Sequence, residues 1–287
     1  MKTVKLLGAV AALALTATQA SAERLFGLTA DNRIVTFNST TPGVTTSSGS
    51  IAGLQAGDVL TGIDLRPANR TLYSVASNGN LYRIAKDAVG TNYTATLIAD
   101  VGTVSGTRFG IDFNPVADRL RFITDFDQNL RINVDTGATI VDGTISGPGA
   151  EAYVGAAYTN NRVGATSTLL YALDASGNQL ALSTSPNAGT YVDVGVVSGI
   201  DFGGLNVVGF DISGSTGAAY FNNAGALYRL NLQTAAATSL GSIGSGTLVG
   251  LTAGGVPEPA TWGLMILGFG AVGGAMRTRA TRTLATA

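Results

Sequence analysis

The sequence contains no cysteine and no histidine among its 287 residues. These absences exclude Ser-His-Asp and Cys-His nucleophilic catalysis, imidazole general bases and zinc sites with histidine ligands. Any chemistry would have to rest on carboxylates, arginine, tyrosine, the lone interior lysine Lys86 or a bound ion. We therefore assign no catalytic residue and expect no cofactor.

Charge is also scarce, at 12% of all residues. Residues 23–255 hold 12 basic and 17 acidic side chains, which gives this region a net charge of −5. Nucleic-acid binding depends on clustered lysine and arginine that displace counterions from phosphates. The sequence therefore predicts no nucleic-acid partner.

Glycine, in contrast, is abundant, with 39 residues. A short phrase that contains glycine recurs at nearly regular intervals, as in Leu60-Thr-Gly-Ile-Asp64. Its glycines are Gly62, Gly110, Gly155, Gly209 and Gly250. A hairpin pattern and a further β-prone run follow each of the first four phrases, and no stretch between them shows a sustained helical period. A repeat of this size with four strands is typical of a β-propeller blade, so we predict an all-β fold.

The two ends of the repeat region predict a closed ring. The repeats begin at Leu25 with the second strand of a unit, and they end with an unpaired first strand at 248–252. Pairing of these N- and C-terminal strands would complete five four-stranded blades and remove two open sheet edges. The long interval around 198–204 leaves room for a protruding loop or a degenerate sixth blade. The low-complexity segment 39–50 is interpreted as a strand in preference to a surface for O-linked sugar.

The segment 1–22 is typical of a secretory signal peptide. Lys2 and Lys5 precede the apolar run 6–15, and the small residues Ala20 and Ala22 mark the cleavage point. We expect signal peptidase to remove this segment and the repeat domain to span 23–255.

The last part of the chain, 256–287, has a different composition. Pro257-Glu258-Pro259 interrupts the strand pattern, and the uncharged, mostly apolar run 261–276 begins near Trp262. Three basic residues follow the run, and they are Arg277, Arg279 and Arg282. An apolar segment with an interfacial tryptophan and arginines on the inner side is typical of a transmembrane helix, although this run is short for a permanent span.

This tail resembles the PEP-CTERM sorting signal that exosortases read. The resemblance covers the segment after Gly255 and includes the proline-glutamate-proline motif, the tryptophan, Gly268-Phe-Gly270 and the basic end. It implies arrest in the membrane, cleavage near Pro257–Pro259 by an exosortase and transfer to the cell surface, typically in bacteria that make exopolysaccharide. An uncleaved C-terminal anchor is the alternative.

The repeat region is similar to an uncharacterised family of bacterial repeat domains of propeller type. The cues are Gly62-Ile-Asp64, the turns at Arg66-Pro67 and Asn114-Pro115, and the strand Leu81-Tyr-Arg-Ile84. The resemblance implies a propeller architecture and no assigned activity.

Three aspartates occupy the same place in three of the repeated phrases, and they are Asp64, Asp112 and Asp211. If they face the axis of the ring, they could form an acidic site for a cation or a sugar hydroxyl. Alternatively, each binds neighbouring backbone amides or an arginine and locks one blade to the next. The second interpretation is favoured, because a residue repeated in several units more often serves the fold.

A weaker metal candidate begins at Asp125 and includes Asp127 and Asn129. The spacing imitates the start of an EF-hand loop, but the sixth and twelfth positions, which should be glycine and glutamate, are Leu130 and Thr136. We interpret the segment as a hairpin turn, and we expect no metal ion there.

These observations favour an exported surface or extracellular-matrix protein associated with exopolysaccharide or biofilm, in which a non-enzymatic propeller binds a glycan or a surface protein. The alternative is a hydrolase or lyase that acts on glycans through carboxylates, since a fold does not decide function. A purely structural surface protein without a ligand is the third interpretation.

Overall fold

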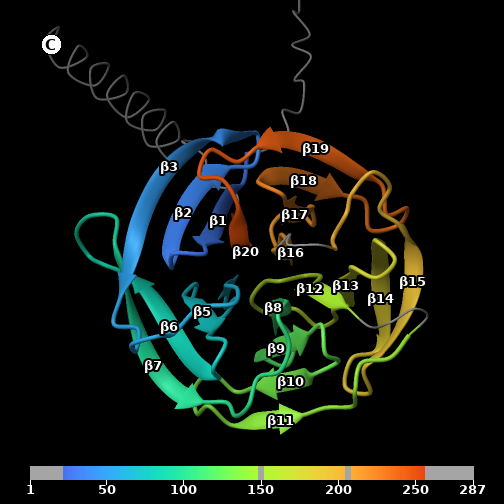
Figure 1. Cartoon of the computed structure of the whole chain (residues 1–287), viewed down its shortest axis with the longest axis horizontal. Coiled ribbons are helices and arrows are strands. Elements are labelled where there is room, and N and C mark those ends of the chain that lie inside the picture. The colour runs from blue at the N-terminus through green and yellow to red at the C-terminus, as the bar shows by residue number, and fades with distance from the viewer. Residues whose placement is uncertain (1–21, 148–151, 204–207, 256–287) are drawn as a thin grey trace, which may run out of the picture.

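The structure, a computed structural model, describes residues 22–147, 152–203 and 208–255. These residues form five four-stranded antiparallel units arranged around a central axis, as Figure 1 shows. The predicted signal peptide up to residue 21 and the predicted sorting helix 261–276 lie outside the described residues. Within the described ranges, no helix has the length and apolar character needed to cross a membrane.

The strands follow the chain in blade order. The first blade contains β1 (Arg24–Thr29), β2 (Arg33–Asn38), β3 (Thr41–Ala52) and β20 (Leu248–Gly255). The second contains β4 (Asp64–Leu65), β5 (Leu72–Val75), β6 (Asn80–Lys86) and β7 (Tyr93–Asp100). The third contains β8 (Phe109–Asn114), β9 (Arg119–Thr124), β10 (Asn129–Ile132) and β11 (Thr139–Val141). The fourth contains β12 (Tyr153–Tyr158), β13 (Leu170–Asp174), β14 (Gln179–Ser185) and β15 (Thr190–Val196). The fifth contains β16 (Phe210–Ile212), β17 (Ala219–Asn223), β18 (Ala226–Leu230) and β19 (Ala237–Ser242).

The ring closes through the two ends of the repeat region. Strand β20 pairs antiparallel with β1 over six registered positions, from Arg24 opposite Gly255 to Thr29 opposite Leu248. The predicted pairing of terminal strands is therefore confirmed. The segment interpreted as a strand in preference to a sugar-bearing surface is also a strand, since β3 covers most of it.

One contact between blades was not predicted. The end of β3 pairs in parallel with the start of β7, at Ile51 opposite Tyr93 and Ala52 opposite Thr94. This contact joins the outermost strands of the first and second blades into one eight-stranded sheet. The other three blades remain separate four-stranded sheets.

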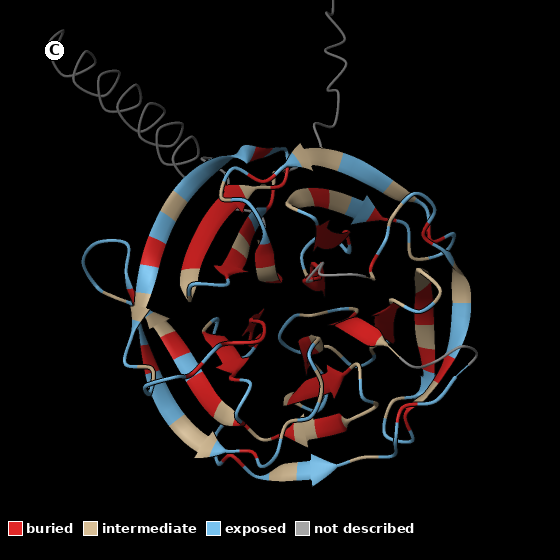
Figure 2. Ribbon diagram, in the orientation of Figure 1, coloured by how far each residue is buried: buried red, intermediate tan, exposed pale blue. Residues whose placement is uncertain are grey.

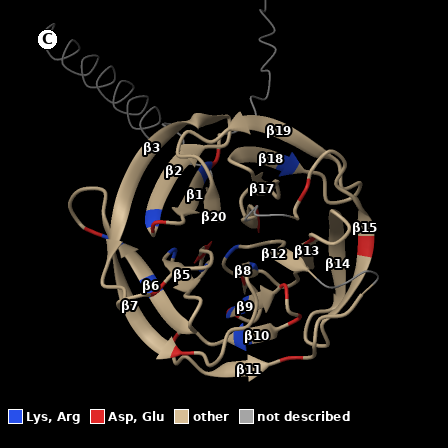
Figure 3. Cartoon of the chain, in the orientation of Figure 1, with Lys and Arg blue, Asp and Glu red and all other residues tan. Residues whose placement is uncertain are grey.

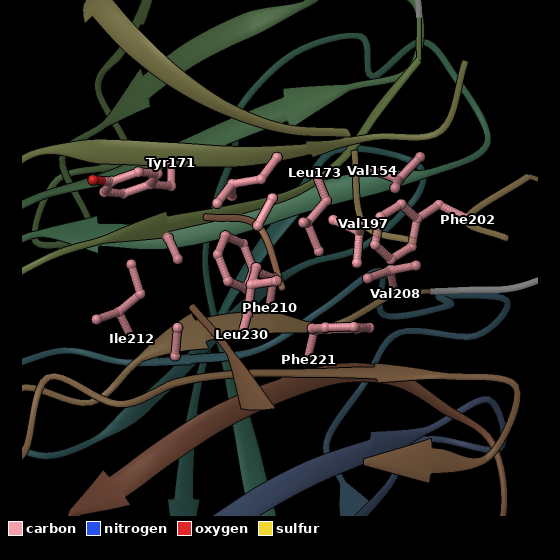
Figure 4. Packing of buried hydrophobic residues seen from close by; sticks show 14 residues of the cluster. Val154, Tyr171, Leu173, Val197, Phe202, Val208, Phe210, Ile212, Phe221 and Leu230 are labelled. Atoms are coloured by element: carbon pink, nitrogen blue, oxygen red, sulfur yellow. The ribbon is translucent and has the colours of Figure 1, made fainter. Parts of the chain in front are cut away.

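The hydrophobic core lies between neighbouring blades. Five clusters of buried apolar side chains correspond to the five interfaces around the ring. Figure 2 shows the same pattern, with buried residues on the inner strands and exposed residues on the outer strands. In the cluster of Figure 4, Val154 and Leu173 of the fourth blade face Phe221 and Leu230 of the fifth. Each blade therefore needs both neighbours to bury its two faces.

The repeated glycines allow the five innermost strands to approach one another. A Cβ atom on Gly110 would lie 2.7 Å from the backbone nitrogen of Ala156 in the next blade. A Cβ atom on Gly209 would lie 2.3 Å from the backbone nitrogen of Leu251. The phrase is therefore repeated because a side chain at this position would collide with the adjacent strand. Beside these glycines, the axis holds a cavity of only about 10 Å³, roughly the space of one water molecule.

A pair of salt bridges from one buried arginine also joins two blades. The guanidinium of Arg66, which follows β4, binds Asp118 and Asp135 of the third blade with contacts of 2.6 Å to each. The hydrogen bonds from Arg66 to Asp118 and Asp135 raise the pKa of the guanidinium. The Arg66 side chain is 8% exposed. The interface between the second and third blades therefore contains salt bridges as well as apolar packing.

Candidate functional site

The three repeated aspartates meet at the axis of the ring. Asp64 lies on β4, Asp112 on β8 and Asp211 on β16, the innermost strands of the second, third and fifth blades. One carboxylate oxygen from each lies within 4.8 Å of the other two. All three residues are buried, with 3% exposure or less. The sequence left open whether these side chains converge, and in the structure they do.

Each aspartate also holds the backbone of the following blade. Oδ2 of Asp64 accepts a hydrogen bond from the amide of Phe113 at 2.7 Å. Oδ2 of Asp112 accepts one from the amide of Tyr158 at 2.9 Å, and Oδ2 of Asp211 accepts one from Ala253 at 2.5 Å. The blade-locking interpretation predicts contacts of this kind, from each aspartate to a backbone amide of the next blade. They use one oxygen of each carboxyl group and leave Oδ1 for other contacts.

The two remaining blades place different residues at the same level. Thr252 of β20 lies between two aspartates, with its hydroxyl 2.7 Å from Oδ1 of Asp64 and 2.9 Å from Oδ2 of Asp211. A hydroxyl has one proton, so it can donate to only one of these oxygens at a time. Ala157 of β12 occupies the fifth position, is fully buried and offers no polar side-chain atom. The ring of polar groups is therefore incomplete at the fourth blade.

Burial dominates the electrostatics of the three carboxyl groups. Burial raises the pKa of Asp112 well above its ordinary value, and the negative charges of Asp64 and Asp211 add to the effect. Burial likewise raises the pKa of Asp64, and it raises the pKa of Asp211 to about 7 with a contribution from the charge of Asp64. The four ion pairs found in the described part of the chain involve other residues. The cluster therefore needs protons or a cation to offset its negative charge.

A hollow of about 110 Å³ lies beside this cluster at one mouth of the axis. Its lining includes Arg70, Asn161, Arg162, Ser215 and Gly255. The Nδ2 atom of Asn161 lies 3.4 Å from Oδ1 of Asp112, so this side chain separates the hollow from the aspartates. The guanidinium of Arg70 donates a hydrogen bond to the carbonyl of Gly254. No sequence pattern predicts this hollow, because its lining comes from four different blades.

The weaker metal candidate does not form a cluster. Asp125 accepts hydrogen bonds from the backbone amides of Thr107 at 2.8 Å and Arg108 at 3.2 Å. Asp127 has a positive φ of 61° in the same turn. Among the described residues, the axial aspartates are the only group of acidic side chains close enough to share a metal ion. Asp125 and Asp127 lie in the turn between β9 and β10.

Asn129, the third residue of that candidate, belongs to a buried network around Arg121. The Nη1 atom of Arg121 donates to Oδ1 of Asn129 at 2.7 Å and to Asp142 at 2.6 Å, and its Nε contacts the hydroxyl of Tyr158 at 3.2 Å. Arg131 binds the same Asp142 carboxylate at 2.6 Å. Sequence reasoning did not select Arg121, although an arginine between Leu120 and Phe122 on an inner strand is an unusual residue in a two-sided core.

Acid should weaken this network. Burial opposes ionisation of Asp142, but hydrogen bonds from Arg131 and Arg121 outweigh it and lower the pKa. A carboxyl group with a lowered pKa in the fold stabilises the protein above its unfolded pKa of about 3.9 and loses that effect as the pH falls. We expect the free energy of unfolding in urea to fall between pH 5 and pH 2, and to fall less steeply in Asp142→Asn. If the free energy of unfolding fell equally steeply with pH in both proteins, the stabilising role of ionised Asp142 would be contradicted.

The comparisons with known proteins agree with this architecture. The fold and its axial site define a β-propeller-like domain. Residues 33–252 match the family described as "Domain of unknown function (DUF4394)", and the chain belongs to that family. Residues 255–280 match the PEP-CTERM protein-sorting motif. The motif marks an exported protein that an exosortase processes and sorts to the cell surface. No curated protein matches the sequence.

Solved structures of other proteins also resemble this chain. A chain in a crystal structure of a nidogen/laminin complex has a TM-score of 0.50 and 13% identity, covering 81% of this chain and 98% of its own. A protein of unknown function from Bacteroides thetaiotaomicron has a TM-score of 0.47 and 13% identity, with coverage of 83% and 66%. A glutaminyl cyclase from Myxococcus xanthus has a TM-score of 0.42 and 11% identity, with coverage of 70% and 89%. At 13% identity, the first likeness concerns the fold alone.

The predicted processing residues lie almost entirely outside the described part of the chain. These are Ala20, Pro257, Glu258, Pro259, Trp262, Arg277, Arg279 and Arg282. Ala22 is the first described residue, and the buried Glu23 follows it with its backbone amide 3.1 Å from the hydroxyl of Ser39. The last described residue, Gly255, lines the hollow at the mouth of the axis. The sorting motif therefore begins beside that hollow.

Proposed function

We propose that this protein is a non-enzymatic surface propeller that binds an acidic group of an extracellular polymer in the hollow at the mouth of its axis. The observation that carries the proposal is the presence of two arginines, Arg70 and Arg162, in the lining of one small hollow. Figure 3 shows basic and acidic residues distributed around the whole ring, so a pair of arginines in one concave site is a local feature.

The chemistry of the hollow favours an anion. Guanidinium groups form paired hydrogen bonds with carboxylate and sulfate-like groups, and Asn161 and Ser215 add neutral polar atoms. The volume of about 110 Å³ is below the range of sites that enclose a whole small molecule, so one substituent of a polymer fits better. The net charge of −5 opposes long-range attraction, but salt screens charges beyond about 8 Å under physiological conditions.

The positions of the carboxyl groups favour binding over catalysis. A glycosidase places two carboxyl groups on either side of the bond that it cleaves. Asp64, Asp112 and Asp211 are instead buried, and each binds a backbone amide of the next blade. A hydrolase or lyase on this fold is therefore the less supported alternative.

The proposal includes the route to the cell surface. Signal peptidase would cleave after Ala22, and the exosortase would cleave near Pro257–Pro259 after the apolar run 261–276 has stopped in the membrane. The domain would then present its surface to the polysaccharide or matrix outside the cell. Mass spectrometry of the surface-released protein would give both mature ends.

Binding to polygalacturonate, an acidic polysaccharide, and to neutral dextran tests the proposal. We expect the released protein to bind polygalacturonate and not dextran, and Arg162→Ala to weaken that binding roughly tenfold or more, because it removes charge-assisted hydrogen bonds. Arg83→Ala removes an exposed arginine from β6 and is the matched control, with no expected change.

Two results would contradict this function. Equal binding of wild type and Arg162→Ala would move the binding site away from the hollow. Release of new reducing ends from the polysaccharide would identify a glycan-active enzyme.

A further inference from the structure

We infer that the axial aspartates form a binding site for one divalent cation, with calcium as the ion. The site goes beyond binding at the mouth of the axis, because it is built on the three buried carboxyl groups and shares only Asn161 with the hollow. It consists of Asp64, Asp112 and Asp211 together with Thr252 and the amide of Asn161.

The spacing of the oxygen atoms suits calcium. Calcium binds oxygen at about 2.3–2.6 Å, so any two oxygens bound to one ion lie no more than about 5.2 Å apart. One oxygen from each aspartate falls within 4.8 Å of the others. Magnesium demands a nearly ideal octahedron and usually keeps several of its waters, which suits a buried site on rigid strands less well. Carboxylate, hydroxyl and amide oxygens are hard ligands, which disfavours metals that prefer sulfur or nitrogen.

The hydrogen bonds to the next blade pre-position these ligands. Oδ2 of each aspartate is fixed by a backbone amide, so the orientation of each carboxyl group is set by the fold. Two of the Oδ1 atoms have side-chain contacts: that of Asp64 lies 2.7 Å from the Thr252 hydroxyl, and that of Asp112 lies 3.4 Å from Nδ2 of Asn161. A cation at the cluster would therefore leave the three contacts from backbone amides to carboxylates in place.

An independent observation points to a cation. Oδ1 of Asp211 is buried and accepts no hydrogen bond, and the whole residue is only 3% exposed. Oδ1 of Asn161, on the side chain that covers the cluster, is also buried without a partner. An acceptor left unpaired in the interior is destabilising, and native structures pair nearly all such atoms. Both unpaired atoms are acceptors, which a positive ion satisfies and an anion does not.

The side-chain amide of Asn161 can become a ligand of the ion if it rotates by half a turn. Its Nδ2 currently faces Asp112, and rotation about the last side-chain bond exchanges the nitrogen and oxygen positions. Oδ1 would then face the ion as a fourth or fifth oxygen ligand with Thr252. The same side chain also lines the hollow at the mouth of the axis.

Metal content and thermal unfolding of the full chain test this inference. We expect the protein purified with calcium and then dialysed against calcium-free buffer to retain about one calcium per chain by elemental analysis. Addition of 5 mM calcium chloride to chelator-treated protein should raise the Tm by about 5 °C or more, as expected for a ligand that binds only the folded state. Magnesium at the same concentration should raise it less.

Three variants test whether calcium binds at the axial aspartates. Asp211→Asn should lose the bound calcium and the rise in Tm. Asn161→Ala changes a side chain at the edge of the cluster and should weaken binding while the domain remains folded, which keeps the test informative if the first variant does not fold. Asp100→Asn removes an exposed carboxylate at the end of β7 and should behave as wild type. Binding of terbium, detected by luminescence sensitised by tyrosine, should follow the same order.

Three outcomes would overturn the inference. Wild type without bound calcium, and with a Tm that calcium leaves within one degree, would mean that protons or water alone fill the cluster. An equal loss in Asp100→Asn would show a general charge effect. An equal response to magnesium would overturn the assignment to calcium.

Discussion

A chain that ends at Thr247 is expected to lose cooperative folding, whereas a chain that ends at Gly255 should unfold at the temperature of the full chain. The shorter chain lacks β20, which pairs with β1 along its whole length. The longer one lacks only the sorting tail and serves as the control. Circular dichroism during heating, with urea unfolding of both proteins, measures the difference.

The expected loss is large because β20 contributes to the core as well as to the sheet. Leu248 and Leu251 are 0% and 2% exposed, and both belong to the cluster between the fifth and first blades. Removal of one buried leucine side chain costs about 2–5 kcal/mol, so the two together approach the total stability of a typical domain, about 5–15 kcal/mol. A sharp unfolding transition near that of the control would mean that the ring is stable without closure.

The second large effect is expected from Gly209→Ala, which should lower the free energy of unfolding by about 3 kcal/mol or more. The added methyl group would lie 2.3 Å from the backbone nitrogen of Leu251 and 2.6 Å from Oδ1 of Asn222. That Asn222 oxygen accepts a hydrogen bond from the amide of Gly209, so relief of the collision would also disturb this contact. The backbone of the adjacent strand leaves little room for adjustment.

Gly43→Ala in β3 is the matched control for this experiment. A Cβ atom there would meet only the carbonyl of Ser242, at 3.6 Å, which is an ordinary contact. We expect a change within about 0.5 kcal/mol, the usual range for a surface substitution. Equal stability of the two variants in urea would contradict the view that the glycine phrase exists for close approach of the inner strands.

Much of the architecture could be predicted because it is encoded in short, local patterns. The period of the glycine phrase, the hairpin turns and the alternation of apolar residues are properties of a few consecutive residues. The frame of the repeat, which begins with a second strand and ends with a first strand, was enough to predict the pairing of β1 with β20. The sorting motif is equally local, and the match over 255–280 confirms it.

The contacts between β3 and β7 could not be predicted from such patterns. Their parallel pairing at Ile51 and Tyr93 depends on how closely two neighbouring outer strands approach, which the ring geometry decides. The network of Arg121 could not be predicted for the same reason. Its partners Asp142 and Asn187 come from different blades, and no spacing in the sequence indicates that they meet.

The sequence by itself determined the repeat unit and the sorting motif of the tail, because both depend on residues that are neighbours in the chain, but it left five or six blades open. Only the tertiary structure decided that Asp64, Asp112 and Asp211 converge, since they belong to three different blades and lie far apart along the chain. The five glycines bring the inner strands close enough for the three carboxyl groups to approach within 4.8 Å. Ring closure thus turns a repeated structural residue into a buried acidic cluster that needs a proton or a cation.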